Sequence, residues 1–333
     1  MSKSILVTGP NLHPDAVRLA TASGYALHYA PPYASPDQLV AALAESGAAA
    51  IIARMGRIDA AVMDAAPGLR VISKHGAGVD NIDLDAAAAR GIPVLAATGA
   101  NAISVAEHAI ALILGVVKRL GPLDAGLRAG RWEKPEYSGR ELAGLRLGLL
   151  GMGAIAQATA RMACGLGLKL HAFDPFAPDD AFARIDIDRC KTLAELLRNS
   201  DILSLHCPLN DATRAVVNAA NIAQMPARSY VINTARGGLI DEDALLEAIR
   251  SGHLAGAGLD TFAVEPPPAN HPFLSDPRVL VTPHIGGVTD EANARVGTEA
   301  VSGIIDMLEG REIPAHRIMN RHLLAQLAPA TGE

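Results

Sequence analysis

The sequence predicts an α/β protein with two doubly wound parallel-sheet domains. Three observations support this fold class: the length, an alternation of short apolar runs with amphipathic stretches, and glycine-rich turns between them. At 333 residues, the chain exceeds the size at which one core usually stops growing, so two domains of roughly 100–200 residues are expected. Hydrophobic residues form 50% of the chain and charged residues 19%, a composition typical of a folded α/β protein.

The first 100 residues alternate β-branched runs with Ala-rich helical patterns. The predicted strands are residues 4–9, 49–54, 71–78 and 92–97, and the predicted helices are residues 14–23, 37–46 and 84–90. Strands that alternate with helices of this length favour an open parallel sheet with crossover helices.

A second alternating series follows a long helix at 102–117 and a loop-rich passage at 121–140. It runs from residue 142 to residue 287. The last predicted helix, about 290–309, has no strand after it, so we expect it to return to the first sheet. The predicted domains are therefore 1–100 plus 288–333, and 101–287, with no further regulatory domain after them.

Composition argues against several functional classes. The net charge of -6 comes from interspersed acidic and basic residues, without the basic block that would bind nucleic acid. The three cysteines lack the spacing of a disulfide framework or zinc site, so we expect reduced thiols and no metal. The longest apolar helix is too short to cross a membrane, and no secretory signal precedes the first strand. A cytoplasmic protein is expected.

A dinucleotide-binding pattern opens the second series. The apolar strand before it ends in a G-x-G-x-x-A turn that leads into a helix, whose N-terminal N–H groups can meet a pyrophosphate. The predicted cofactor contacts in this turn are Gly151, Met152, Gly153, Ala154 and Ile155. A plain glycine turn between strand and helix is the alternative, since the motif alone is weak.

Asp174 ends the next predicted strand, 18 residues after Ala156. That spacing suits a carboxylate that accepts hydrogen bonds from the adenosine ribose. Asp174 would repel a 2′-phosphate, and residues 175–177 offer no Arg to bind one. The pattern favours NAD over NADP, with a turn-capping Asp as the alternative.

Three strand ends in the second series carry candidate catalytic residues, Arg236, Glu265 and His284. Hydride transfer to a keto carbon needs a proton donor for the oxygen and a cation for the substrate carboxylate, which His284 and Arg236 could supply. Glu265 could orient the imidazole and favour its protonated form. A helix-capping Arg, a surface Glu and a core His are the alternatives.

Three motifs in this order, NTARGGLIDEDAL, LDTFAVEP and TPHIGG, resemble the signatures of the D-isomer-specific 2-hydroxyacid dehydrogenase family. The resemblance implies two Rossmann-like domains with the active site in the cleft between them, and Arg236, Glu265 and His284 as the catalytic trio. It implies NAD-dependent interconversion of a small D-2-hydroxy acid and its 2-keto acid. The pattern is most similar to 3-phosphoglycerate dehydrogenases and hydroxypyruvate or glyoxylate reductases.

The resemblance also implies further contacts. The nicotinamide side of the cofactor pocket would be lined by Cys207, Pro208, Thr213, Thr234, Ala235, Asp260 and Gly286. The substrate would be bound by Lys74, Gly76, Ala77, Gly78, Asn101 and Arg236. The alternative for the cofactor contacts is ordinary strand-end packing, and for the loop with Gly76, Ala77 and Gly78 it is a simple glycine turn. Lys74 could instead be an exposed lysine without a role, and Asn101 could cap the helix.

The long helix and the segment around Trp132 would support a homodimer by the same resemblance. Two other functions stay open on this scaffold: an NAD(H)-binding sensor or corepressor, and oxidation of formate or phosphite. Formate dehydrogenases of the family have Gln where this chain has Glu265, which argues against that activity.

Overall fold

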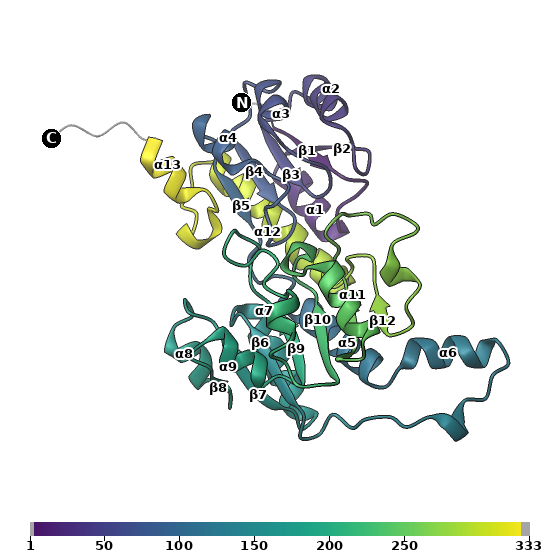
Figure 1. The fold of residues 1–333 in the computed structure, drawn as a ribbon. Helices are drawn as coiled ribbons and strands as arrows, with labels where there is room; N and C mark the ends of the chain where they lie inside the picture. Colours follow the sequence, from purple (N-terminus) through teal and green to yellow (C-terminus); the bar gives the residue numbers. More distant parts are fainter. Residues whose placement is uncertain (1–2, 328–333) are drawn as a thin grey trace. The chain divides into compact units, whose positions relative to one another are not determined.

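The computed structural model describes residues 3–327, which form two α/β units (Figure 1). Unit 1 combines the described residues up to Asn101 with those from Val288 onwards, and unit 2 is Ala102–Gly287. The outer ends of the predicted first domain, residues 1–2 and 328–333, lie outside the described residues.

Unit 1 contains a five-stranded parallel sheet in the order β2-β1-β3-β4-β5. Its strands are β1 (Ser4–Thr8), β2 (Ala26–Ala30), β3 (Ala50–Ala53), β4 (Val71–Lys74) and β5 (Val94–Ala96). The strand β2 was missed by the sequence pattern, because this edge strand is only partly buried and lacks a continuous apolar run. The strand order reverses between β1 and β3.

Among the described residues, six helices accompany the unit 1 sheet. They are α1 (Pro14–Ala22), α2 (Pro36–Ser46), α3 (Ala60–Asp64), α4 (Leu84–Ala89), α12 (Asp290–Leu308) and α13 (Arg321–Leu327). Side-chain caps fix where several of them begin; Ser35, for example, forms a capping box with Gln38 at the start of α2. Apolar residues of α1 and α12 share one core with β1, whereas those of α2 and α3 form another. The helix α13 corrects the prediction that the helix at about 290–309 is the last one.

Unit 2 contains a seven-stranded parallel sheet in the order β12-β11-β10-β9-β6-β7-β8. Its strands are β6 (Arg146–Leu150), β7 (Lys169–Phe173), β8 (Asp188–Arg189), β9 (Ile202–Leu205), β10 (Ser229–Asn233), β11 (Leu254–Leu259) and β12 (Val279–Val281). The strands β9 and β10 are buried along their whole length, as expected for a sheet covered on both faces. The strand order reverses between β6 and β9.

Two apolar layers cover the unit 2 sheet. One layer contains α5 (Ala102–Val117) and α7 (Ala154–Gly165), and the other contains α9 (Leu193–Arg198), α10 (Ala219–Ile222) and α11 (Glu242–Arg250). A short helix, α8 (Asp179–Ala183), lies between β7 and β8 in the chain. Because both sheets are parallel and carry helices between their strands, the predicted fold class is confirmed.

A helix replaces part of the predicted loop at 121–140. The helix α6 (Leu120–Arg128) is followed by a short 3₁₀ turn at Lys134–Glu136. Gly121 and Pro122 led to the prediction of a loop here, but both lie in the first turn of the helix, where proline is tolerated. Asp124 and Arg128 form an ion pair one turn apart on the helix. Among residues 3–327, no helix is both long and apolar enough to span a membrane.

We expect Gly148→Ala to lower the free energy of unfolding by about 1–3 kcal/mol, because the site has no room for a methyl group. A Cβ at Gly148 in β6 would lie 1.9 Å from Ser200 Oγ. Ser200 is fully buried and donates a hydrogen bond to the Leu196 carbonyl at 2.6 Å, so it cannot easily move away. Urea unfolding of the variant and the parent protein measures the effect.

Gly165→Ala is the matched control, because Gly165 is the exposed last residue of α7 and a Cβ there meets no atom within 4 Å. This change should leave the free energy of unfolding unchanged or raise it by up to about 1 kcal/mol. Equal losses in the two variants would contradict the packing argument.

Candidate functional site

Three loops at the carboxyl edge of the unit 2 sheet carry the predicted catalytic residues. Arg236 follows β10, Glu265 follows β11 and His284 follows β12. The strands β10, β11 and β12 are neighbours and run parallel, so these loops leave the sheet at the same edge. Ligands of open α/β sheets bind at that edge.

Glu265 and His284 form a direct pair. Glu265 Oε2 lies 2.7 Å from His284 Nδ1, and Glu265 Oε1 accepts a hydrogen bond from the Phe262 N–H at 3.1 Å. Because the carboxylate occupies Nδ1, it leaves His284 Nε2 as the ring nitrogen that can face a substrate. The two side chains are 37% and 46% exposed, so both remain accessible to a small molecule. His284 has a φ of 55°, an uncommon left-handed conformation for a residue other than glycine.

The pKa of Glu265 is lowered below its ordinary value. Burial alone would raise this pKa, but the hydrogen bond and charge of His284, the Phe262 N–H and the positive charge of Arg236 outweigh burial. Glu265 is therefore a carboxylate at neutral pH. It can stabilise an imidazolium and fix its orientation.

The Arg236 loop is held by Asn233 and Gly237. Asn233, fully buried at the end of β10, donates from Nδ2 to the Arg236 carbonyl at 2.8 Å and accepts from the Ala235 N–H at 3.0 Å. A Cβ at Gly237 would lie 1.9 Å from the carbonyl carbon of Phe262. Only glycine therefore lets the loop that follows β10 approach the loop that follows β11 so closely.

Asp260 ties the loop after β12 to the end of β11. Its carboxylate accepts hydrogen bonds from Thr282 Oγ1 at 2.5 Å, from the Ile285 N–H at 2.9 Å and from the Gly286 N–H at 2.8 Å. Burial would raise the pKa of Asp260, but the hydrogen bonds from His108, Thr282 and the two N–H groups lower it. Asp260 is 1% exposed, so the structure gives it a positioning role. Its predicted contact with nicotinamide, like that of Gly286, stays a prediction.

The glycine-rich turn lies where the strand order of the sheet reverses, between β6 and β9. Gly151 has a φ of 99°, and a Cβ there would lie 2.8 Å from the His206 carbonyl, so the turn packs directly on the segment after β9. Gly153 precedes α7, and a Cβ there would meet no atom within 4 Å. This open space in front of unpaired helix N–H groups fits a pyrophosphate. Met152 is buried, whereas Ala154 and Ile155 begin the helix.

Asp174 follows β7 and accepts three backbone hydrogen bonds, from the N–H groups of Met152, Phe176 and Ala177. The carboxylate therefore joins the glycine-rich turn to the next loop. The sequence window after Asp174 contains no Arg, but Arg189 returns to this turn from β8 and donates to the Asp174 carbonyl at 3.4 Å. The ribose contact of Asp174 stays a prediction.

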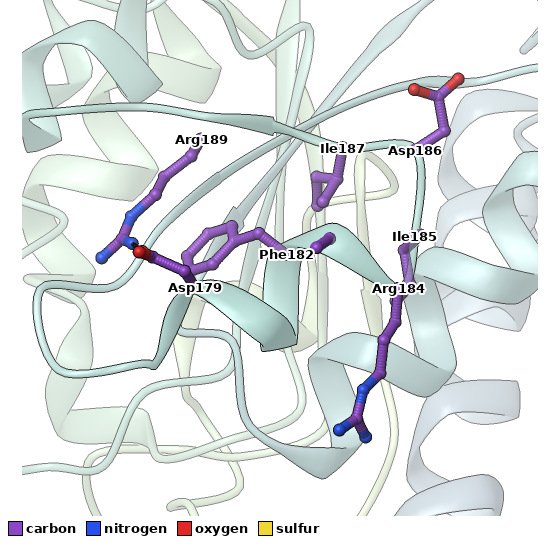
Figure 2. A pocket seen from close by; sticks show the side chains of 8 residues that line it. Asp179, Phe182, Arg184, Ile185, Asp186, Ile187 and Arg189 are labelled. Carbon is purple, nitrogen blue, oxygen red and sulfur yellow. Dashed lines mark hydrogen bonds and ion pairs between the residues drawn. The ribbon is translucent and has the colours of Figure 1, made fainter.

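A surface pocket of about 580 Å³ lies beside this turn (Figure 2). Arg189 pairs with Asp179 and stacks over the Phe182 ring at 4.4 Å, and the figure shows these side chains together. None of the predicted site residues lines the pocket. Sequence reasoning missed Arg189, because its partners are 10 to 15 positions away along the chain.

The other predicted cofactor contacts also lie at this edge. Cys207 and Pro208 follow β9, and Thr213 Oγ1 donates to the Pro208 carbonyl at 2.6 Å. Burial raises the pKa of Cys207 to about 11, so it is a thiol at neutral pH. Thr234 and Ala235 follow β10, and the buried Thr234 Oγ1 has no hydrogen-bond partner among the described residues.

The predicted substrate residues other than Arg236 belong to unit 1. Lys74 ends β4 and donates to Asn81 Oδ1 at 2.8 Å. Gly76 has a φ of 137°, which requires glycine, and Ala77 and Gly78 continue the same loop. The buried Asn101 Oδ1 accepts no hydrogen bond from any described residue, so the capping alternative is wrong for this atom. Burial lowers the pKa of His75, which precedes this loop, to about 3, so its ring is neutral at neutral pH and adds no positive charge there.

Several positioning residues were missed by sequence reasoning. They are Asn233, Gly237, Glu242 and His108. Asn233, Gly237 and Glu242 fall inside a recognised motif, which was their only signal. No cluster of His, Cys, Asp and Glu suited to a metal ion occurs among residues 3–327.

Comparisons with known proteins agree with this arrangement. Residues 110–286 match the NAD-binding domain of the D-isomer specific 2-hydroxyacid dehydrogenases. The hydroxypyruvate reductase of Thermotoga maritima is 42% identical over 254 residues, which cover 76% of this chain and 82% of that protein. The D-3-phosphoglycerate dehydrogenase of Mycobacterium leprae is 37% identical over 281 residues, which cover 84% of this chain and 53% of that protein.

The solved TT0316 protein of Thermus thermophilus superimposes with a TM-score of 0.85 at 36% identity, covering 93% of this chain and 98% of that one. The chain spans about half the length of the D-3-phosphoglycerate dehydrogenases that it matches. The family predicted from the motifs is thus confirmed. The protein belongs to the D-isomer specific 2-hydroxyacid dehydrogenase family, and its unit 2 contains the NAD-binding domain of that family.

Proposed function

We propose that the protein is an NAD-dependent dehydrogenase that interconverts a small D-2-hydroxy acid and its 2-keto acid, of the 3-phosphoglycerate or hydroxypyruvate/glyoxylate type. The observation that carries the proposal is the 2.7 Å contact between Glu265 and His284. A carboxylate that holds an accessible imidazole is the arrangement of a general acid and base. The relatives named hydroxypyruvate reductase and D-3-phosphoglycerate dehydrogenase support the substrate class.

The proposed chemistry divides among three side chains. Arg236 binds the substrate carboxylate through two parallel charge-assisted hydrogen bonds, which also fix the rotation of the substrate. His284 protonates the keto oxygen during reduction and removes the hydroxyl proton during oxidation. Glu265 remains ionised, holds the ring through Nδ1 and stabilises its charged form.

NAD(H) supplies or accepts the hydride when it is bound. The residues proposed to hold it are those of the glycine-rich turn, with Asp174 at the ribose. The open space beside Gly153 and the unpartnered Thr234 Oγ1 support this assignment. A negative charge at Asp174 favours NADH over NADPH.

The proposed contacts to the substrate from unit 1 are Lys74, Asn101 and the loop with Gly76, Ala77 and Gly78. Among residues 3–327, the N–H groups of Ala77 and Gly78 donate no hydrogen bond to a backbone carbonyl, which supports their availability to an anion. The unpartnered Asn101 Oδ1 supports a contact with a hydroxyl or other donor.

We also propose that the protein acts as a homodimer in the cytoplasm. Support for the dimer comes from large apolar side chains exposed on and after α6: Leu120, Leu127 and the 71% exposed Trp132. An exposed apolar surface of this kind is typical of a protein interface. The location rests on the sequence alone.

A substrate panel tests the proposed activity. Purified protein is mixed with NADH and each of hydroxypyruvate, glyoxylate, pyruvate, 2-ketoglutarate, phenylpyruvate and 3-phosphohydroxypyruvate, and the loss of NADH absorbance is followed. We expect turnover of at least one acid, and slower turnover with NADPH. Binding of NADH without turnover of any acid would favour an NAD(H)-binding sensor instead.

We expect Arg236→Lys to raise the KM for the keto acid and lower kcat/KM by at least about tenfold, because lysine cannot form the two parallel bonds. The Kd for NADH should stay within about twofold, since this residue is proposed to bind the substrate. Steady-state kinetics and NADH fluorescence measure the two effects. Arg161→Lys on the exposed side of α7 is the control. An unchanged KM would remove Arg236 from the substrate site.

We expect Glu265→Gln to move the alkaline limb of the kcat profile for keto-acid reduction to lower pH by about one unit. The carboxylate favours protonated His284, and the neutral amide loses this effect. Because the pKa of Glu265 is lowered, its carboxylate keeps its charge at neutral pH and loses it only when the carboxyl is protonated in acid. Glu247→Gln on α11 is the control, and an unmoved limb in Glu265→Gln would contradict the pairing.

A further inference from the structure

His108 on α5 contacts the loop that carries His284, although no motif gave it a role. We propose that His108 is a positioning residue for the proton-donor loop, residues 282–286. The inference rests on the proposed function in taking His284 as the proton donor. Its structural basis lies within unit 2 alone.

The hydrogen-bond pattern fixes the direction of each contact. His108 Nε2 lies 2.8 Å from Thr282 Oγ1 and 3.3 Å from Asp260 Oδ1. Thr282 has one hydroxyl hydrogen, which it donates to Asp260 Oδ1 at 2.5 Å, and the ionised carboxylate can only accept. The Nε2 atom of His108 therefore carries a hydrogen and donates it to both oxygens.

The hydrogen bond from His108 stabilises the buried negative charge of Asp260. Asp260 is 1% exposed, and a buried carboxylate is costly unless several donors surround it. Two of its donors, the N–H groups of Ile285 and Gly286, directly follow His284 in the chain. Loss of the His108 donor leaves Asp260 with fewer hydrogen-bond donors. Any movement of its carboxylate would also displace the backbone N–H groups of Ile285 and Gly286, which follow His284.

The helix α5 supports the same loop at a second point. Ser104 Oγ donates to the Gly286 carbonyl at 2.6 Å, and Ser104 precedes His108 by four residues, so both side chains lie on one helix face. A Cβ at Gly286 would lie 3.0 Å from Asp260 Oδ2 and 3.4 Å from His108 Cδ2. The loop thus fits against His108 and Asp260 without a gap.

Two loss variants and one rescue variant test the proposal. In His108→Leu the donor is absent, and in His108→Asn the amide reaches only the position of Nδ1. In His108→Gln the amide N–H can occupy the position of Nε2. His253→Leu is the matched control, because His253 Nε2 donates at 2.9 Å to the Ile222 carbonyl elsewhere in unit 2.

The first readout is the ¹⁵N spectrum of the His284 ring in the whole protein without substrate, assigned with His284→Gln. We expect both loss variants to shift or broaden the His284 signals, His108→Gln to restore them, and His253→Leu to leave them unchanged. With a substrate from the panel, the loss variants should lower kcat by about tenfold to a hundredfold, with an unchanged Kd for NADH. Their kinetic isotope effect with 4-deuterated NADH should rise as the chemical step becomes slower.

Unchanged His284 signals in the loss variants would overturn the proposal, as would equal changes in His253→Leu. Two loss variants keep the test decisive if one fails to fold. The ring signals are measured without turnover, so they test the positioning role even if the panel shows no activity. Failure of the proposed function would give a different result: the parent protein would turn over no acid of the panel, while the His284 signals would still respond to the His108 variants as expected.

Discussion

The site depends on one geometric constraint: parallel strands place all their carboxyl ends at one edge of a sheet. In unit 2, the strands β7, β6, β9, β10, β11 and β12 lie next to one another in that order. Their loops carry, in turn, Asp174, the glycine-rich turn, Cys207, Arg236, Glu265 and His284. The cofactor pattern and the three proposed catalytic residues therefore share an edge although they span more than a hundred positions. The strand order reverses between β6 and β9, so the connections on either side of this point diverge and leave space at the glycine-rich turn for a pyrophosphate.

Within that edge, the Glu265–His284 pair is supported from two sides. The loop of Glu265 is held at Ala263, whose N–H donates to Glu242 Oε1 at 3.0 Å, and by the approach of Gly237. The loop of His284 is held by Asp260. Each loop is thus fixed by a carboxylate that accepts backbone N–H groups. The proposed catalytic role of the pair needs such support, because small displacements of reacting groups are costly in rate.

The sequence predicted the buried elements well and the exposed ones poorly. Strands such as β9 and β10 are continuous apolar runs, whereas β2 is a partly exposed edge strand without such a run. The helix α6 was missed because glycine and proline near its start resemble a loop. Polar residues at strand ends marked Arg236, Glu265 and His284. His108 and Glu242 could not be found in this way, because their roles depend on contacts with residues far along the chain.

Exposure separates the groups that can exchange a proton from those that only hold the site. Burial lowers the pKa of His206 to about 4, so this ring is neutral at neutral pH and serves as a structural partner of Ser204. Asp260 is buried with its oxygens committed to protein donors, so its charge is a fixed anchor. Glu265 and His284 are instead 37% and 46% exposed and bonded to each other. A proton can therefore reach His284 from water or substrate, while the carboxylate behind it keeps the ring in place.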